Sequence, residues 1–130
     1  MTKRPNRASR TIRVLIADDS ALLREALGRF LSALPGVAVV GLCRDGSEAL
    51  ELAPLVRPDV VLMDLAMPRL DGLAATRVLK SAAAAPAVVI CSMEDSDELR
   101  LAARAAGADA LVRKRDLAHL VERLLWTVAQ

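Results

Sequence analysis

The chain has 130 residues, enough for one domain with its own apolar core and too few for two domains of ordinary size. Hydrophobic residues make up 54% and charged residues 26%, which excludes the disordered class, and the lack of aromatic residues beyond Phe30 and Trp126 argues against a base-stacking nucleic-acid module. Residues 1–13 carry five basic side chains and no acid, whereas the other 117 residues have a net charge of −3. We therefore interpret residues 1–11 as a basic, disordered leader and residues 12–130 as one domain that does not itself contact nucleic acid.

Short β-branched runs alternate with longer segments of helical period along the whole chain. In order, the pattern predicts strand 12–17, helix 20–34, strand 37–43, helix 46–56, strand 58–63, helix 71–84, strand 86–91, helix 95–106, strand 109–112 and helix 116–129. The strand segments are apolar on both faces, as strands covered by helices on each side must be. Because parallel strands need crossover connections, this alternation predicts an α/β fold, a five-stranded parallel sheet doubly wound by helices.

Local signals agree with these helix limits. Ser20 is a plausible N-cap, Pro35-Gly36 stops the first helix, Gly46-Ser47 opens the second and Gly107 caps the end of the fourth. The first helix has an apolar stripe centred on Leu23, Leu27, Phe30 and Leu34, and the last has one formed by Leu117, Leu120, Val121, Leu124, Leu125 and Val128. Leu22 and Trp126 lie off these stripes. For Trp126 we favour an interface over a role in covering the sheet edge, because tryptophan is enriched at binding hot spots.

Two features bear on the cellular location. The longest apolar stretch, Ala82–Cys91, is interrupted by Pro86 and is far shorter than the roughly 20 residues of a membrane span. Cys43 and Cys91 lack the spacing of a redox or zinc motif and lie in apolar runs, which indicates buried thiols in a reducing compartment. The sequence therefore predicts a cytoplasmic protein without membrane contact.

Conspicuous polar residues stand where four of the predicted strands end. Asp18-Asp19 follow the first strand, Asp64 the third and Ser92 the fourth, and Lys114 comes just after the fifth. The carboxyl ends of parallel strands share one edge, which is where ligands bind in such folds. Like charges about 4 Å apart repel by about 4 kcal/mol at an effective dielectric near 20, so one lysine cannot balance three aspartates. A divalent cation can, and an oxygen-only ligand set suits Mg²⁺.

Each of these residues also has a simpler explanation. Asp18-Asp19 could only cap the first helix, Asp64 could begin a turn before Pro68, and Lys114 could be one more solvated charge. Taken together these explanations are much less convincing. The chain has 15 arginines and three lysines, so a lysine at the strand end that faces the acids stands out.

Other chemistries fit poorly. No GxGxxG follows the first strand and no GxxxxGK[ST] loop occurs, which argues against dinucleotide and P-loop sites. His119 is the single histidine, so neither a catalytic triad nor a histidine zinc site has support. A magnesium-dependent phosphohydrolase with an aspartate nucleophile would need a second acid two residues after Asp64, where this chain has Ala66.

Over about residues 12–128 the chain resembles the receiver domain of two-component response regulators. Four segments carry the resemblance, in order and at the expected intervals: VLIADDS (14–20), VVLMDLAMPRLDG (60–72), VVICSMED (88–95) and GADALVRK (107–114). The SMED segment most resembles the subclass usually fused to a helix-turn-helix DNA-binding domain. The resemblance implies a flavodoxin-like strand order 2-1-3-4-5 with five helices, and a role in signal transduction and transcription regulation.

The resemblance also implies a Mg²⁺ site. Asp19 and Asp64 would bind the ion directly, the backbone carbonyl of Ala66 would be a third ligand, and Asp18 would act through a water molecule. Asp64 would be the phosphoacceptor, a nucleophile that takes a phosphoryl group from a phosphohistidine.

The same resemblance assigns two further residues to the phosphoryl group. Lys114 would pair with one of its oxygens and the Ser92 hydroxyl would hydrogen-bond another. The added charge would then bias the segment after Ser92, with helix 4, between two packings. The domain would catalyse its own phosphorylation and slow dephosphorylation, and so be a switch and not an enzyme with turnover.

Several positions depart from the usual receiver pattern. Leu111 stands where an aromatic ring normally turns inward, so the usual readout is in doubt, and Arg115 replaces a proline, so a cis peptide cannot be assumed there. Ala66 lies two residues after the acceptor and Met93 directly after Ser92; the alanine side chain cannot orient a water molecule, whereas that of Glu94 can. We therefore expect slower self-dephosphorylation than in an Ala66→Asn variant.

The implied partners are a sensor histidine kinase or a histidine phosphotransfer protein. Leu22 would anchor the histidine-bearing helices of such a partner, although a scattered exposed leucine is as good an explanation. A homodimer through the helix 4, strand 5 and helix 5 face is also expected. The alternative is a pseudo-receiver, a protein-interaction module of the same fold that phosphorylation does not control, to which Leu111 lends some support.

Overall fold

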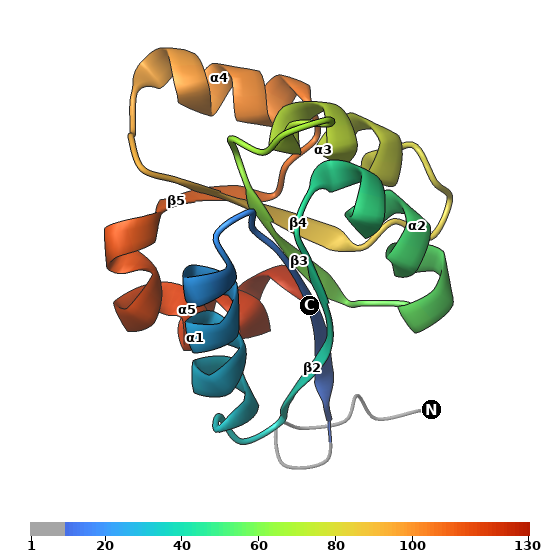
Figure 1. The fold of residues 1–130 in the computed structure, drawn as a ribbon, viewed down its shortest axis with the longest axis vertical. Coiled ribbons are helices and arrows are strands. Elements are labelled where there is room, and N and C mark those ends of the chain that lie inside the picture. The colour runs from blue at the N-terminus through green and yellow to red at the C-terminus, as the bar shows by residue number, and fades with distance from the viewer. Residues whose placement is uncertain (1–9) are drawn as a thin grey trace.

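The computed structural model describes residues 10–130, so most of the leader expected at residues 1–11 lies outside the described residues. Strands and helices alternate strictly (Figure 1). Their bounds are β1 (Ile12–Ala17), α1 (Ala21–Ser32), β2 (Val37–Cys43), α2 (Gly46–Val56), β3 (Val60–Asp64), α3 (Gly72–Lys80), β4 (Ala87–Ser92), α4 (Asp97–Ala105), β5 (Ala110–Arg113), a short 3₁₀ turn η1 (Lys114–Asp116) and α5 (Leu117–Val128). Every paired strand is parallel and the order is β2-β1-β3-β4-β5, which confirms the predicted fold class and topology.

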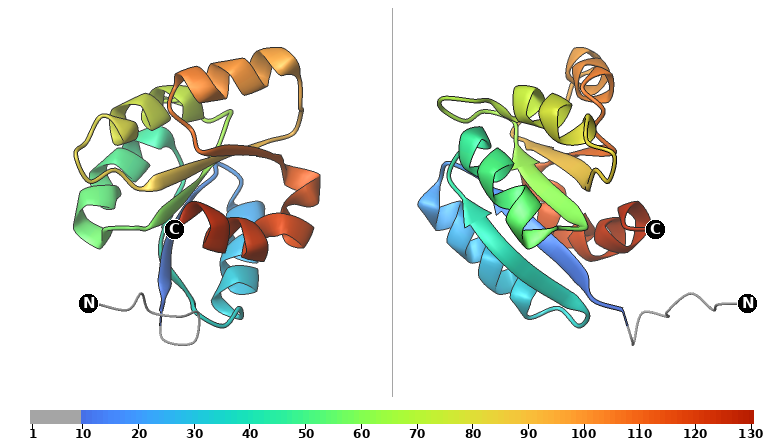
Figure 2. Two further views of the ribbon diagram at one scale, coloured as in Figure 1. Left: turned by 180° about the vertical axis from the view of Figure 1, so that it is seen from behind. Right: turned by 90° about the vertical axis from the view of Figure 1, so that its right-hand side faces the viewer.

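The sheet separates two apolar layers. Side chains alternate along β1, so that Ile12, Val14 and Ile16 pack on the side of α1 and α5. Leu15 and Ala17 pack on the other side, with α2, α3 and α4. Figure 2 shows these two sets of helices on opposite faces of the sheet. The central strand β3 is buried along its whole length, as predicted for a strand covered on both faces.

Helix ends follow the expected signals at most positions. The Ser20 hydroxyl caps α1 by accepting from the Leu23 amide, and Asp45, one residue before the predicted Gly46 start, caps α2. Gly107 has φ +97° and its amide donates to the Arg104 carbonyl, which ends α4 with a left-handed glycine.

The helix predicted for 71–84 is shorter in the structure and ends at Lys80. Its cap, Ser81, donates its hydroxyl to the Val78 carbonyl at 2.6 Å, and the Lys80 ammonium donates to the Pro86 carbonyl at 3.0 Å. These contacts turn the chain towards β4, so the alanine run 82–85 forms the connection in spite of its helix propensity.

Of two predictions about helix faces, one is partly right and one is wrong. In the predicted α1 stripe, Leu27 and Leu34 pack against the core, whereas Leu23 and Phe30 are 39% and 42% exposed, and Leu31 is the fully buried leucine of this helix. Trp126 is only 5% exposed and belongs to the apolar layer of α1 and α5. Its ring lies against Gly36, where an added Cβ would come within 3.0 Å of a ring carbon. Trp126 therefore covers the core beside the α1–β2 turn and does not form an exposed interface.

Both cysteines are buried free thiols, as predicted. Burial raises the pKa of Cys43 and of Cys91 to about 12, so each thiol stays protonated and behaves as a small apolar side chain. None of the helices formed by residues 10–130 has the length and apolarity needed to cross a bilayer.

Candidate functional site

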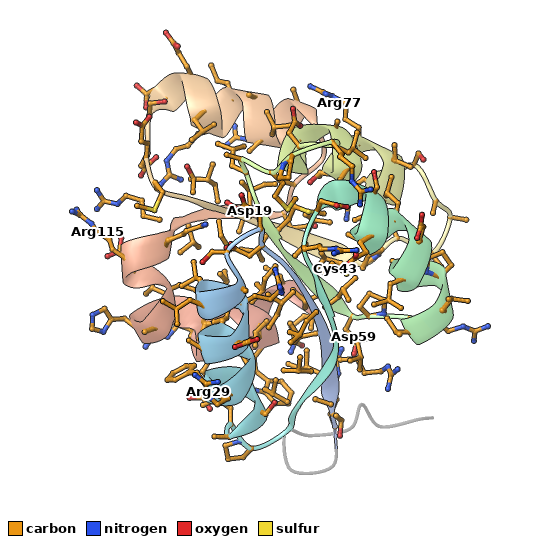
Figure 3. All side chains as sticks on the ribbon, viewed as in Figure 1. Asp19, Arg29, Cys43, Asp59, Arg77 and Arg115 are labelled. Carbon is orange, nitrogen blue, oxygen red and sulfur yellow. The ribbon has the colours of Figure 1, made fainter. Side chains whose placement is uncertain are left out.

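The three aspartates predicted to meet do so at the carboxyl edge of the sheet. Asp18 leaves β1 and Asp64 ends β3, and these strands are neighbours in register, with Ala17 opposite Met63. One carboxylate oxygen from each of Asp18, Asp19 and Asp64 lies within 4.8 Å of the others. Asp18 and Asp64 are 5% and 4% exposed, whereas Asp19 is exposed at this edge (Figure 3). The pocket thus joins two buried acids to an accessible one.

Lys114 holds the two buried acids together. Its ammonium lies 2.9 Å from Asp18 Oδ2 and 3.0 Å from Asp64 Oδ1, and its side chain is 14% exposed. Burial works against the charge of Lys114, but the hydrogen bonds to Asp18 and Asp64 outweigh it and hold the pKa of the ammonium above its usual value. The lysine after the fifth strand therefore faces the acids, as predicted.

The surroundings of Asp64 act on its pKa in opposite directions. Burial raises this pKa above the usual range, the Lys114 hydrogen bond opposes the rise, and the charges of Asp18 and Asp19 add to it. Three carboxylates beside one ammonium leave an excess of negative charge in a half-enclosed space. An added cation would relieve this repulsion.

Short-range hydrogen bonds fix the direction of Asp18. Its Oδ1 accepts from the Ser20 amide at 2.9 Å, and its backbone carbonyl accepts from Arg24 Nη1 at 2.7 Å. Asp18 thus helps to form the entry to α1, as the simpler explanation held, while its Oδ2 points to Lys114. Both roles are present in one residue.

The backbone directly after Asp64 packs closely against Gly72, at the start of α3. The Leu65 amide donates to the Cys91 carbonyl at 3.0 Å, and the Leu65 carbonyl accepts from the Gly72 amide at 2.9 Å. A Cβ on Gly72 would lie 2.2 Å from the Asp64 carbonyl oxygen, closer than any side chain allows. Gly72 was not predicted as a site residue, although the Asp71-Gly72 pair was a signal for such a close approach.

Ser92 ends β4 and is 3% exposed, next to Asp64. Its hydroxyl oxygen accepts from the Glu94 amide at 3.1 Å. Asp64, Ala66, Ser92 and Met93 line one side of a cavity of about 650 Å³ between β3, β4 and α4. This space gives an incoming group access to the Asp64 carboxylate.

The donor set fits a hard divalent cation. All three converging side chains offer carboxylate oxygens, and Ala66, on the loop beside them, is exposed. Mg²⁺ prefers oxygen ligands and keeps several waters, which the open side of this pocket allows. The arrangement can therefore combine a carboxylate nucleophile, a cation and an ammonium at one point.

These observations define the class of protein: a doubly wound α/β domain with an acidic pocket at the carboxyl edge of its sheet. The response regulator receiver domain model matches residues 14–125, and the chain belongs to this family. It is thus a receiver domain of two-component systems.

Particular relatives support the assignment. The chain is 51% identical over 104 residues to protein-glutamate methylesterase/protein-glutamine glutaminase 5 of Myxococcus xanthus, which covers 79% of this chain and 30% of that protein. The response regulator domain of Thermotoga maritima CheB has a TM-score of 0.85 at 31% identity and covers 92% of this chain and 97% of that one. A LuxR-family response regulator of Aurantimonas has a TM-score of 0.81 at 33% identity, with 90% and 86% covered.

The relatives include different types of protein. One structural neighbour is a LuxR-family response regulator, and the subclass that the SMED segment predicted stays a prediction. The methylesterases were not anticipated, and the chain spans about 30% of the length of those that it matches.

Proposed function

We propose that the chain is a phosphorylation-activated switch with Asp64 as its phosphoacceptor. The single observation that carries this proposal is the buried Asp64 carboxylate, which lies 3.0 Å from the Lys114 ammonium and beside two further acids. An Asp64 oxygen attacks the phosphorus of a phosphohistidine, the P–N bond breaks, and the imidazole leaves and takes up a proton. The donor is a sensor histidine kinase or a histidine phosphotransfer protein.

The metal role is assigned to the residues around Asp64. Asp19 and Asp64 would hold Mg²⁺ directly, the Ala66 carbonyl would be a third ligand, and Asp18 would act through water. When bound, the ion neutralises charge on the transferring phosphoryl group. The carboxylate oxygens of Asp18, Asp19 and Asp64, which lie within 4.8 Å of one another beside the Lys114 ammonium, support this assignment, because a bound cation would relieve their mutual repulsion.

Lys114 and Ser92 would hold the phosphoryl oxygens. Lys114 already contacts Asp64, so a small movement brings its ammonium to an oxygen bound there. The Ser92 oxygen accepts from the Glu94 amide, and its own O–H can donate to a second phosphoryl oxygen. Pairing Ser92 with the phosphoryl group would pull on the segment that leads into α4, which is where we place the output of the switch.

Two surfaces are assigned to partners. Leu22 on α1 is 79% exposed, as expected for an apolar anchor of the kinase or phosphotransfer helices. On the opposite layer, Leu101 of α4 is 64% exposed, which supports a homodimer through α4, β5 and α5. We assign no nucleic-acid or membrane contact to the domain itself.

The wider setting follows from the same reasoning. The protonated, buried thiols fit a reducing compartment, so we place the protein in the cytoplasm. We propose that the domain performs only its own phosphorylation and slow dephosphorylation, and that its output is the regulation of transcription.

One observation favours a second function, that of a pseudo-receiver. Leu111 is half-buried in the layer of α2, α3 and α4, where an aliphatic side chain cannot act as the inward-turning ring of the usual readout. A pseudo-receiver would bind partners through the same fold without phosphorylation.

A phosphodonor assay tests the proposal. The chain is incubated with acetyl phosphate and Mg²⁺, and its intact mass is measured. We expect one phosphoryl adduct that is lost in Asp64→Ala and in excess chelator, and that persists in Asp97→Ala, a matched change of an exposed acid on α4. No adduct in the wild-type chain, or the same adduct in Asp64→Ala, would favour the pseudo-receiver.

A further inference from the structure

The loop after Asp64 is tied to the loop before α2 by a buried carboxylate. We call residues 65–71 the β3–α3 loop. Asp45 is 3% exposed, and its Oδ1 accepts from the Glu48 amide at 2.8 Å as the N-cap of α2. Its Oδ2 accepts from two nitrogens of Arg69, Nε at 2.9 Å and Nη2. One carboxylate thus fixes a helix start and the β3–α3 loop together.

The backbones of the two loops also touch. The Gly46 amide donates to the Leu70 carbonyl at 3.2 Å, next to the Asp45–Arg69 pair. A Cβ on Gly46 would lie 2.4 Å from that carbonyl oxygen, so only glycine permits the approach. The Asp45–Arg69 ion pair therefore lies beside a backbone contact in which the two loops cannot shift far relative to each other.

Arg69 has a backbone conformation that an arginine rarely adopts. Its φ is +65°, and the Leu70 amide donates to the Pro68 carbonyl at 2.7 Å, which closes a three-residue turn around it. Non-glycine residues in this region are strained and persist where the surroundings hold them. The two hydrogen bonds from Arg69 to Asp45 Oδ2 hold this conformation in place.

We propose that the Asp45–Arg69 pair is a positioning device for the metal site, which fixes the β3–α3 loop so that the Ala66 carbonyl faces the acid cluster. The inference rests on the proposed function, because Ala66 is a ligand only there. Ala66 is exposed and lies between two anchored points, the Leu65 backbone and Arg69. When Arg69 loses its partner, the strained turn relaxes and the carbonyl direction is no longer set.

The test measures Mg²⁺ affinity by isothermal titration calorimetry in Arg69→Gly. Glycine accepts φ +65° without strain, so the variant keeps the turn accessible and loses only the side-chain contact. We expect the Kd for Mg²⁺ to rise about tenfold, the lower end of the effect of residues that support metal ligands. Simple electrostatics predicts the opposite sign, since removal of a cation near carboxylates strengthens cation binding.

Two further variants separate positioning from charge. Asp45→Asn keeps a good N-cap but removes the charged oxygen that accepts from Arg69, so it should weaken Mg²⁺ binding to a similar degree. The double variant should be no weaker than either single variant, because both changes break one contact. Arg77→Ala is the matched control: Arg77 projects from the outer side of α3 and has no ion pair within residues 10–130 (Figure 3).

The outcomes distinguish this inference from the proposed function. If the wild-type chain binds Mg²⁺ and takes up a phosphoryl group while Arg69→Gly binds Mg²⁺ equally or more tightly, the positioning role is wrong and the proposed function stands. Fully additive losses in the double variant also overturn the positioning role. A wild-type chain without Mg²⁺ affinity overturns both.

Discussion

Lys114→Met tests the charge balance of the acid pocket. Methionine keeps the length of the side chain and removes the ammonium that lies 2.9 Å from Asp18 and 3.0 Å from Asp64. At an effective dielectric near 20, each of these contacts corresponds to roughly 5–6 kcal/mol of Coulomb attraction before desolvation is counted. Without Mg²⁺, the variant leaves two buried carboxylates with no cation beside them.

The expected loss of unfolding free energy is about 3–5 kcal/mol, the usual cost of removing one partner of a buried pair. Unfolding of a 130-residue chain has an entropy of about 270 cal/mol/K, so Tm should fall by about 11–18 °C. Mg²⁺ then supplies the missing positive charge. The Kd of the variant for Mg²⁺ should be about tenfold lower than that of the wild type, which corresponds to about 1.4 kcal/mol of binding free energy. The variant therefore gains more stability from Mg²⁺ than the wild type does.

Calorimetry of both proteins with and without Mg²⁺ measures these effects. Lys80→Met is the matched control, because Lys80 pairs with Asp109 at 3.0 Å away from the pocket and both side chains are partly exposed. It should lose about 1–2 kcal/mol and respond to Mg²⁺ as the wild type does. Equal losses in the two variants, or a Kd for Mg²⁺ that is unchanged or higher in Lys114→Met, would refute the charge-balance argument.

Three further predictions concern the same site. Burial raises the pKa of Asp64, so the folded chain binds the carboxyl proton of Asp64 more tightly than the unfolded chain does. The stability that comes from this protonation is complete in acid and is lost as the pH rises through the raised pKa. Asp64→Asn should therefore be more stable than the wild type at pH 7 without Mg²⁺, and urea unfolding should show the difference closing below about pH 3.9; a gap that widens in acid contradicts this. Gly72→Ala should lose about 3 kcal/mol or fail to fold, because its methyl would lie 2.2 Å from the Asp64 carbonyl, whereas Gly28→Ala, with a nearest contact of 3.4 Å to Leu42, should gain up to about 1 kcal/mol in thermal unfolding. Ala66→Asn should shorten the lifetime of the phosphorylated mass peak, since an amide can orient water, and an unchanged or longer lifetime would count against that role.

The strand-end residues were predictable because parallel strands share a carboxyl edge. Asp18 and Asp64 follow neighbouring strands, so their meeting required only the strand order, and Lys114 followed from the same rule. The Asp45–Arg69 pair joins residues 24 positions apart on two connecting loops, and no periodic pattern reports how such loops approach.

Trp126 was misplaced for a different reason. Helical periodicity predicts the direction in which a side chain points from the helix axis, but it does not predict which neighbouring segment packs against that face of the helix. Here the Gly36 turn closes over the tryptophan, and glycine makes the room for the ring. The shortened α3 has the same origin, because contacts of Lys80 and Ser81 overrule the propensity of an alanine run.

The position of Trp126 makes it a selective optical probe. Trp126 packs against Gly36, and the Gly36 carbonyl accepts a hydrogen bond from the amide of Ile12, the first residue of β1. Asp18 lies at the opposite end of β1, directly after its last residue. Six strand residues at about 3.3 Å each put roughly 20 Å between the two ends. With no tyrosine in the chain, its tryptophan fluorescence comes from this indole alone, so the emission should follow unfolding of the α5 layer and change little when an ion binds at the far edge.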